Sequence, residues 1–263
     1  MIDVAFTRAT IAPARLAVVI DVLRASSSIT QALAGGYRRV MCCRTLAEAV
    51  ALRAPGRVLA GERDCVPPPG FDLGNSPSGF RSPRGEEVVL TTTNGTPALL
   101  EAAASADEVL IGCLLNLRAL LAHIDELAPG DDPDVILICA GTHGRPALED
   151  VYLAGRIAGA LGGARTDAAR VAEAVAASYR EPRAALAASA DAAVLEEVGL
   201  GRDIDCCARE SVLDVVPRTS ALEQGVAIVE PAPTPGQSAS AGSRSEERPL
   251  ASARSEPGAS RGT

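Results

Sequence analysis

Residues 16–28 read LAVVIDVLRASSS, an apolar run followed by a short polar turn, and this stretch decides the fold. Residues 16–22 are apolar apart from Asp21, which is the pattern of a strand buried on both faces. Apolar residues then recur at helical spacing from Ile29 to Leu33. We therefore predict a strand, a turn and a helix in succession, with Ser26 or a neighbouring serine as the N-cap of the helix.

Five further apolar runs predict strands, and helical patterns follow most of them, as in an α/β fold. We expect a mostly parallel or mixed central sheet flanked by helices in three layers. The later strands are predicted at Arg39–Cys43, Arg57–Gly61, Glu87–Thr91, Val109–Gly112 and Asp134–Cys139. Residues 166–198 are rich in alanine and predict a helical carboxyl-terminal part, which Pro182 interrupts.

A change in composition divides the chain. Residues 1–229 carry the strand and helix patterns and predict one α/β domain. Residues 230–263 are dominated by Pro, Ala, Ser, Gly and Arg. Such a segment buries too little apolar surface to offset the entropy lost on ordering, so we predict a disordered low-complexity tail.

The balance of charged residues limits the classes of partner. The formal net charge is -8, and all 25 basic residues are arginines. An acidic protein is poorly suited to nucleic acid or anionic membranes, although a local arginine can still bind one phosphate group. The absence of lysine excludes both a Schiff-base lysine and a P-loop lysine.

The cysteines indicate a reducing compartment. There are 7 of them, an odd number, without a secretory signal or a CxxC motif. This pattern favours reduced thiols over a disulfide framework or a zinc knuckle. No apolar stretch reaches membrane-spanning length, so we expect a soluble, cytoplasmic protein.

Polar residues gather where the first long strand ends. Asp21, Arg24, Ser26 and Ser27 lie at the junction of that strand and its helix. In open parallel sheets, ligands bind outside the carboxyl ends of the strands, where helix N-termini offer N–H groups to anions. One interpretation is a metal-binding acid beside a phosphate-binding arginine. The alternative is a capping serine and a structural ion pair between Asp21 and Arg24.

The segment Gly70–Pro77, which reads GFDLGNSP, is too rich in Gly and Pro for a helix or a strand. Taken alone it also fits an ordinary surface turn, because Asp, Asn, Ser, Gly and Pro are the commonest turn residues. It belongs to a long loop after a predicted strand, and long loops in compact domains are often functional. We predict Asp72 as a ligand and Asn75 and Ser76 as substrate contacts.

Two more polar segments follow predicted strands. Thr91–Thr96, which reads TTTNGT, suits either a phosphate cradle or a capping turn before a helix that Pro97 opens. Glu149 and Asp150 start a later helix, where they either complement the helix dipole or bind a hard cation such as Mg²⁺. His143, in the loop before them, is interpreted as a solvated side chain.

Together these segments resemble the 2-phosphosulfolactate phosphatase family. The resemblance extends from about Val4 to Val229, and it is carried by five motifs: Asp21-Val22-Leu23-Arg24-Ala25, Gly61-Glu62-Arg63, Gly70–Pro77, Thr91–Thr96, and Ala140-Gly141 with Glu149-Asp150. Cys113 replaces a small hydroxyl residue common in the family, and Pro67–Pro69 is an insertion.

The resemblance implies a magnesium-dependent hydrolase that converts 2-phospho-3-sulfolactate to 3-sulfolactate and phosphate, a step on a route to coenzyme M. It also implies an α/β fold distinct from the common phosphatase folds. Leu23 stands where aspartyl-phosphate phosphatases have their second aspartate, so we favour Asp21 as a metal ligand. On this basis Asp21→Asn or Asp72→Asn should abolish phosphate release.

The predicted site combines these segments. The catalytic residues are predicted to be Asp21, Arg24, Asp72 and Asn94. The substrate-binding residues are predicted to be Ser26, Ser27, Arg63, Asn75, Ser76, Thr92, Thr93, Gly95 and Thr96. The candidate ligands of Mg²⁺ are Asp21, Glu62, Asp72, Glu149 and Asp150.

Two rival functions remain open on the sequence. One is a phosphatase for another small phosphorylated carboxylic acid, because the sequence does not separate sulfonate recognition from carboxylate recognition. The other is a non-catalytic protein that binds phosphorylated acids with the same loops. The expected partner is a small anionic organic phosphate, and the oligomeric state stays open, with a homodimer among the options.

Overall fold

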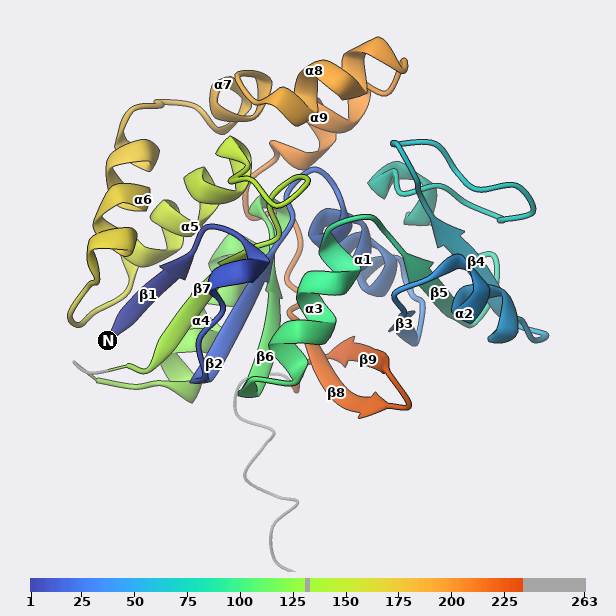
Figure 1. Ribbon diagram of the computed structural model, residues 1–263, viewed down its shortest axis with the longest axis horizontal. Helices are drawn as coiled ribbons and strands as arrows, with labels where there is room; N and C mark the ends of the chain where they lie inside the picture. The colour runs from blue at the N-terminus through green and yellow to red at the C-terminus, as the bar shows by residue number, and fades with distance from the viewer. Residues whose placement is uncertain (131–132, 234–263) are drawn as a thin grey trace, which may run out of the picture. The chain divides into compact units, whose positions relative to one another are not determined.

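A mixed sheet of nine strands organises the part of the chain that the computed structural model describes, residues 1–130 and 133–233 (Figure 1). The strands are β1 (Ile2–Ala5), β2 (Ala14–Ile20), β3 (Arg39–Cys42), β4 (Arg57–Gly61), β5 (Glu87–Thr91), β6 (Ala106–Gly112), β7 (Val135–Cys139), β8 (Pro217–Glu223) and β9 (Val226–Pro231). Their spatial order is β1-β7-β2-β6-β8-β9-β3-β5-β4.

Two parallel blocks make up most of the sheet. The first contains β1, β7, β2 and β6, and the second contains β3, β5 and β4. The antiparallel hairpin β8–β9 lies between them, pairing with β6 on one side and with β3 on the other. The predicted mixed α/β sheet is thus confirmed, although β1, β8 and β9 were not predicted.

Helices cover both faces of the sheet. They are α1 (Ala25–Gly35), α2 (Leu46–Ala51), α3 (Gly95–Ala103), α4 (Leu117–Leu127), α5 (Leu148–Ala160), α6 (Asp167–Ala177), α7 (Pro182–Ala187), α8 (Ala190–Glu197) and α9 (Arg202–Cys207). Short 3-10 turns are η1 (Arg8–Thr10), η2 (Pro77–Phe80) and η3 (Leu114–Asn116). Helices α4, α5 and α6 share one core with β2, and α1 and α3 share another on the opposite face.

Strand β2 shows why the run at residues 16–20 is apolar throughout. Leu16, Val18 and Ile20 belong to the core beneath α4 and α5, whereas Ala17 and Val19 belong to the core beneath α1 and α3. Successive side chains point to opposite faces of a strand, and both faces are covered here. The prediction of a strand buried on both faces is confirmed.

The prediction of a serine N-cap for α1 is wrong. The N-cap position is Arg24, whose side chain makes no capping bond, and Asp21 Oδ1 accepts the first N–H of the helix, that of Ala25, at 2.9 Å. The Ser26 Oγ points back toward the strand, accepting the Asp21 N–H at 2.9 Å and donating to the Val19 carbonyl at 3.3 Å. These hydrogen bonds hold the turn between β2 and α1 and fix Asp21 at the end of β2.

The carboxyl-terminal third follows its predicted organisation. Residues 166–198 contain α6, α7 and α8, and Pro182 begins α7. Of the tail predicted at 230–263, Glu230 and Pro231 belong to β9, and residues from 234 onward lie outside the described residues. Within residues 1–130 and 133–233, no helix combines the length and apolarity that crossing a membrane requires.

Candidate active site

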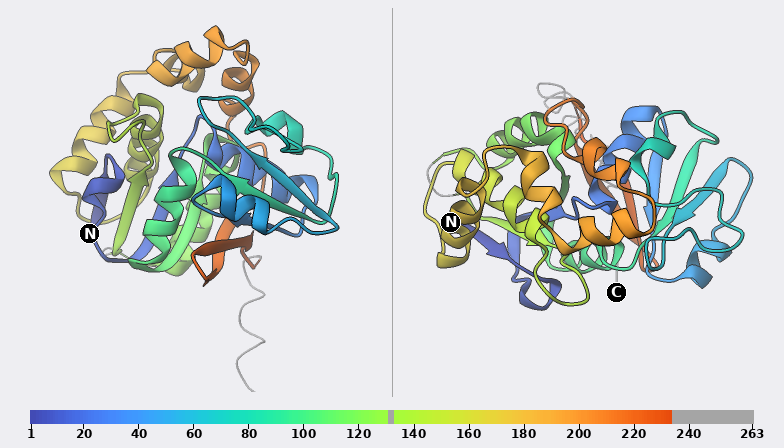
Figure 2. Two further views of the ribbon diagram at one scale, coloured as in Figure 1. Left: turned by 45° about the vertical axis from the view of Figure 1, so that its right-hand side comes forward. Right: turned by 90° about the horizontal axis from the view of Figure 1, so that it is seen from above.

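A cavity of about 310 Å³ opens at the carboxyl ends of β2, β4, β5 and β7. Helices α7 to α9 lie across this end of the sheet in both further views (Figure 2). The cavity is lined by Asp21, Leu23, Arg24, Glu62, Asp64, Cys65, Asn75, Thr93, Asn94, Thr142, His143, Ala190, Asp191, Val194 and Leu195. Both parallel blocks of the sheet and helix α8 therefore contribute residues to one site.

Asp21 is the buried acid at the centre of this arrangement. One carboxylate oxygen accepts the first N–H of α1, and the other, Oδ2, faces the backbone of Gly95 at the start of α3. A Cβ atom at position 95 would lie 2.4 Å from Asp21 Oδ2 and 2.5 Å from the Ala25 Cβ. Glycine is therefore required at this position by close packing, because α3 approaches Asp21 too closely for any side chain.

The surroundings of Asp21 favour its protonated form. Burial raises its pKa from 3.8 to about 7, the Ala25 N–H opposes this, and the charges of Asp191 and Glu62 add to the rise. A carboxylate that is ionised near neutral pH in such a place needs a nearby cation. Perturbed carboxyl groups in a cleft are typical of functional sites.

This pKa gives a stability prediction for the metal-free protein. Between pH 4 and pH 7 the folded state holds a proton on Asp21 that the unfolded state releases, so the free energy of unfolding should fall as pH rises through this window and then level off. Asp21→Asn keeps the acceptor for the Ala25 N–H without the charge. In EDTA, urea denaturation should show the variant more stable than the wild type at pH 8, by at most about 4 kcal/mol.

Below about pH 3 that advantage should disappear, because Asp21 is then largely protonated in both the folded and the unfolded wild type. A variant less stable than the wild type at pH 8 would contradict the assignment of Asp21 as a raised, buried acid.

Glu62 ties together the loops that follow β4 and β5. Its Oε1 accepts the Thr93 N–H at 2.7 Å, and its Oε2 accepts the Cys65 N–H at 3.0 Å. The side chain is buried and lines the cavity. Glu62 thus fixes two loop backbones while presenting negative charge near Asp21.

Arg24 enters the cavity from the turn after β2, but its ionic partner is Asp203 rather than Asp21. Arg24 Nη1 lies 2.7 Å from Asp203 Oδ2, and Nη2 donates to the Cys65 carbonyl at 3.2 Å. The alternative of a structural Asp21–Arg24 pair is therefore wrong.

Two residues of the cavity lining each carry a buried side-chain oxygen that takes no partner from the described residues. Among the described residues, four buried side-chain oxygen atoms accept or donate no hydrogen bond, and Asn75 Oδ1 and Thr93 Oγ1 are two of them. Both residues line the cavity. An unpaired buried polar atom costs free energy, so a polar ligand or a water that reaches either oxygen would stabilise the site.

A second group of acids lies behind the lining. Asp150 accepts the Val22 N–H at 2.9 Å and the Gly141 N–H at 3.1 Å, so each of its oxygens holds a loop. Glu149 is 1% exposed, and its Oε2 has no hydrogen-bond partner. Burial raises the pKa of both carboxyl groups well above the ordinary range, and the charges of neighbouring acids add to this.

Asp191, on α8, brings another carboxyl group into the cavity. It accepts a hydrogen bond from the Thr142 hydroxyl in the loop after β7. It was not predicted, because it lies in an alanine-rich helical region with no motif around it. Its charge acts on both Asp21 and Glu149.

The structure does not bring several predicted site residues to the cavity lining. Asp72 is exposed, and its Oδ2 accepts the Leu59 N–H of β4 at 2.8 Å. Arg63 uses its guanidinium to bind the backbone of its neighbours and the Thr91 hydroxyl at 3.0 Å. Ser76 donates to Asp203 at 2.5 Å. These side chains position loops rather than line the cavity.

The remaining polar residues of these segments also make local bonds. Ser27 Oγ donates to the Val22 carbonyl at 2.8 Å. Thr92 and Thr96 close the turn after β5 reciprocally, since each backbone N–H donates to the other hydroxyl, at 2.9 and 3.0 Å. Asn94 lines the cavity, and its Oδ1 accepts the His143 N–H at 3.4 Å.

The carboxylates of the cavity lining are of a kind that suits a magnesium ion, which would take only some of its ligands from the protein. No group of three or more His, Cys, Asp or Glu side chains in the described part of the chain is placed as a metal cage. Magnesium often takes only one or two carboxylates, with waters and substrate phosphate as its other ligands. Among the hydrogen bonds of the described residues, none uses Asp21 Oδ2, and Asp191 is a second acid in the cavity lining.

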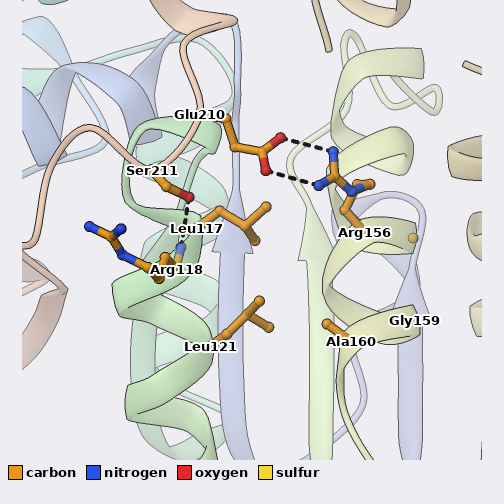
Figure 3. A pocket seen from close by; sticks show the side chains of 9 residues that line it. Leu117, Arg118, Leu121, Arg156, Gly159, Ala160, Glu210 and Ser211 are labelled. Carbon is orange, nitrogen blue, oxygen red and sulfur yellow. Dashed lines mark hydrogen bonds and ion pairs between the residues drawn. The ribbon is translucent and has the colours of Figure 1, made fainter. Parts of the chain in front are cut away.

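Two other hollows lack this chemistry. One, of about 510 Å³, lies between α4 and α5, where Figure 3 shows Arg156 and Glu210 facing each other above Leu117 and Leu121. The Arg156–Glu210 pair is bidentate, with both distances 3.0 Å. The other, of about 620 Å³, lies between α2 and the β8–β9 turn. Neither contains clustered carboxylates with a buried guanidinium.

Comparison with known proteins identifies the family. The family described as 2-phosphosulpholactate phosphatase matches residues 5–221. The chain is 37% identical over 237 residues to a probable 2-phosphosulfolactate phosphatase of Thermotoga petrophila, covering 89% of this chain and 100% of that protein. Proteins with the same description are 38% identical in Pseudothermotoga lettingae, covering 82% and 95%, and 40% identical in Deinococcus radiodurans, covering 77% and 86%.

The match spans every segment that lines the cavity, from the end of β2 to α8. The chain therefore belongs to the 2-phosphosulpholactate phosphatase family, a family of phosphoric monoester hydrolases.

Proposed function

We propose that this protein is a magnesium-dependent phosphatase that hydrolyses 2-phospho-3-sulfolactate to 3-sulfolactate and phosphate, a reaction of the type found on a route to coenzyme M. Support comes from the family match and from the names of the relatives, which are described as probable 2-phosphosulfolactate phosphatases.

The charge pattern of the cavity is the observation that carries the proposal. Of the described residues in its lining, four are carboxylic acids, Asp21, Glu62, Asp64 and Asp191, and Arg24 is the single guanidinium. A substrate with a phosphate, a sulfonate and a carboxylate would be repelled from so acidic a site. Charge balance therefore requires a cation, and carboxylate oxygens are ligands that magnesium prefers.

Five side chains have roles in this proposal. Asp21 Oδ2 and the Asp191 carboxylate would hold the metal, which when bound neutralises charge on the phosphoryl group and orients water. Arg24 binds the phosphate oxygens through a charge-assisted hydrogen bond. Thr93 Oγ1 donates to the substrate.

Asn75 Oδ1 would complete the arrangement by accepting a hydrogen bond from the attacking water. The oxygen of that water bonds to phosphorus while the bond between phosphorus and the C2 oxygen breaks. The proton released by the water balances the one taken up by the leaving oxygen.

The surroundings that we propose for this protein are cytoplasmic. All seven cysteines lie within the described residues, and all are free thiols. A reducing compartment preserves this state. We propose a small anionic organic phosphate as its partner, with no nucleic acid or membrane involved.

The test is phosphate release from 2-phospho-3-sulfolactate, 2-phospholactate and phosphoglycerate, each with magnesium and with EDTA. We expect the highest kcat/KM on phosphosulfolactate, loss of activity in EDTA and recovery when magnesium is restored. If 2-phospholactate or phosphoglycerate is turned over faster, that acid replaces 2-phospho-3-sulfolactate as the proposed substrate. Binding without phosphate release from any of the three would replace the phosphatase with an anion-binding protein.

A further inference from the structure

We propose that Asp203 is a positioning residue that holds Arg24 toward the anionic substrate and couples it to the Gly70–Pro77 loop through Ser76. The inference rests on the proposed function in one respect, the role of Arg24 as the cation that binds substrate. Nothing in the sequence motifs assigns a role to Asp203, which lies on the short helix α9.

The first observation is the burial of the pair. The side chains of Arg24 and Asp203 are 2% and 5% exposed, and Nη1 lies 2.7 Å from Oδ2. A buried guanidinium without a partner is costly, so removing the carboxylate charge destabilises the position that Arg24 occupies. The pair connects the turn after β2 with a helix 179 residues further along the chain.

The second observation is that both oxygens of Asp203 are used. Oδ2 accepts from Arg24, and Oδ1 accepts from the Ser76 hydroxyl at 2.5 Å. Because both of its oxygens are hydrogen-bonded, the Asp203 carboxylate has a fixed orientation. It therefore also fixes the orientation of the Arg24 guanidinium. Ser76 belongs to the Gly70–Pro77 loop. The residue before it, Asn75, lines the cavity.

The third observation concerns the donors of Arg24. A guanidinium has five N–H groups, and the hydrogen bonds to Asp203 and to the Cys65 carbonyl account for two of them. Arg24 also lines the cavity, so it has donors to offer a phosphate or a carboxylate there. The arrangement resembles the outer partners that orient metal ligands, whose loss typically costs 10–100-fold in activity.

A double-mutant cycle separates positioning from a purely structural ion pair. It compares the wild type, Asp203→Asn, Arg24→Gln and the double variant by kcat and KM on 2-phospho-3-sulfolactate with magnesium. It also measures their affinity for inorganic phosphate by calorimetry and their melting temperatures. We expect Asp203→Asn to lower kcat/KM about 10–100-fold. In the Arg24→Gln background the same change should alter kcat/KM by no more than about twofold, because Asp203 acts through Arg24.

Two further variants serve as a second test and as a control. Ser76→Ala should lower kcat/KM in the same direction by a smaller factor with a wild-type melting temperature, and it carries the test if Asp203→Asn fails to fold. Glu210→Gln removes a more exposed ion pair with Arg156, which lies in the separate hollow between α4 and α5, and should leave kcat/KM unchanged (Figure 3).

Wild-type kinetics in both Asp203→Asn and Ser76→Ala, or independent effects of Asp203→Asn and Arg24→Gln, would overturn the proposal while leaving the phosphatase assignment intact. If the wild type releases no phosphate, the phosphate-affinity cycle decides. A loss of affinity in Asp203→Asn that depends on Arg24 then supports positioning although the proposed function fails. A wild type that binds no phosphate overturns both.

Discussion

Replacing Asp21 with asparagine should lower magnesium-dependent phosphate release by about 10²–10³-fold, without loss of the fold. The reason is that Asp21 is buried at the end of β2, where its Oδ2 packs against the start of α3 and the charges of Asp191 and Glu62 act on it. Asparagine preserves the size and the acceptor for the Ala25 N–H but removes the charge that would hold a cation. The measurement is kcat at saturating magnesium by phosphate assay.

Asp72→Asn is the matched control for this experiment. Asp72 was predicted to share the role of Asp21, yet its carboxylate is exposed and binds the Leu59 N–H at the edge strand β4. We now expect near wild-type turnover from Asp72→Asn. Equal losses in the two variants would mean that the site extends to the Gly70–Pro77 loop, and near wild-type turnover in Asp21→Asn would remove Asp21 from the mechanism.

Gly95→Ala should also lower kcat/KM strongly, by about 10²-fold. Alanine normally favours a helix over glycine by about 1 kcal/mol, but its Cβ at position 95 would lie 2.4 Å from Asp21 Oδ2. Either Asp21 or the start of α3 must move, and a displacement of about 1 Å near reacting groups is enough for such a loss. Steady-state kinetics and the melting temperature should be measured together.

Gly159→Ala provides the control, because Gly159 also lies in a helix and the nearest heavy atom to its added Cβ, Glu173 Cγ, is 4.0 Å away. This change should raise the melting temperature slightly and leave kcat/KM unaltered. Unchanged kinetics in Gly95→Ala would show that the contact between α3 and Asp21 is not needed for turnover.

Several strands could be predicted because buried strands have a recognisable pattern of apolar residues in the sequence. The bounds of β4 and β5 agree with the prediction, since each is an apolar run ended by polar turn residues. Strand β1 is only four residues long and gives too short a pattern. Strand β8 starts with a buried Pro and continues with half-buried and exposed residues, so it lacks the apolar run that predicts a buried strand.

The site shows a similar division. Asp21, Arg24, Glu62, Asn75, Thr93 and Asn94 were predicted from polar turns after strands, and all line the cavity. Asp191 and Asp203 were given no role because they reach the site only through the packing of α8 and α9 over distant strand ends. For Asp72, Ser27 and Thr92, local bonds to the backbone explain the residue type, since Asp, Ser and Thr often bind nearby main-chain groups.

The hairpin β8–β9 has a consequence for how the chain folds during synthesis. Its residues, 217–231, follow all the others in the sheet, yet they occupy the middle of it. The two parallel blocks have most of their strands available earlier, but they are joined edge to edge only when this hairpin is inserted. Contacts of such long sequence separation slow folding. Until the hairpin arrives, the facing edges of β6 and β3 are open to pairing with other chains, which makes this interval the stage at which aggregation competes with folding.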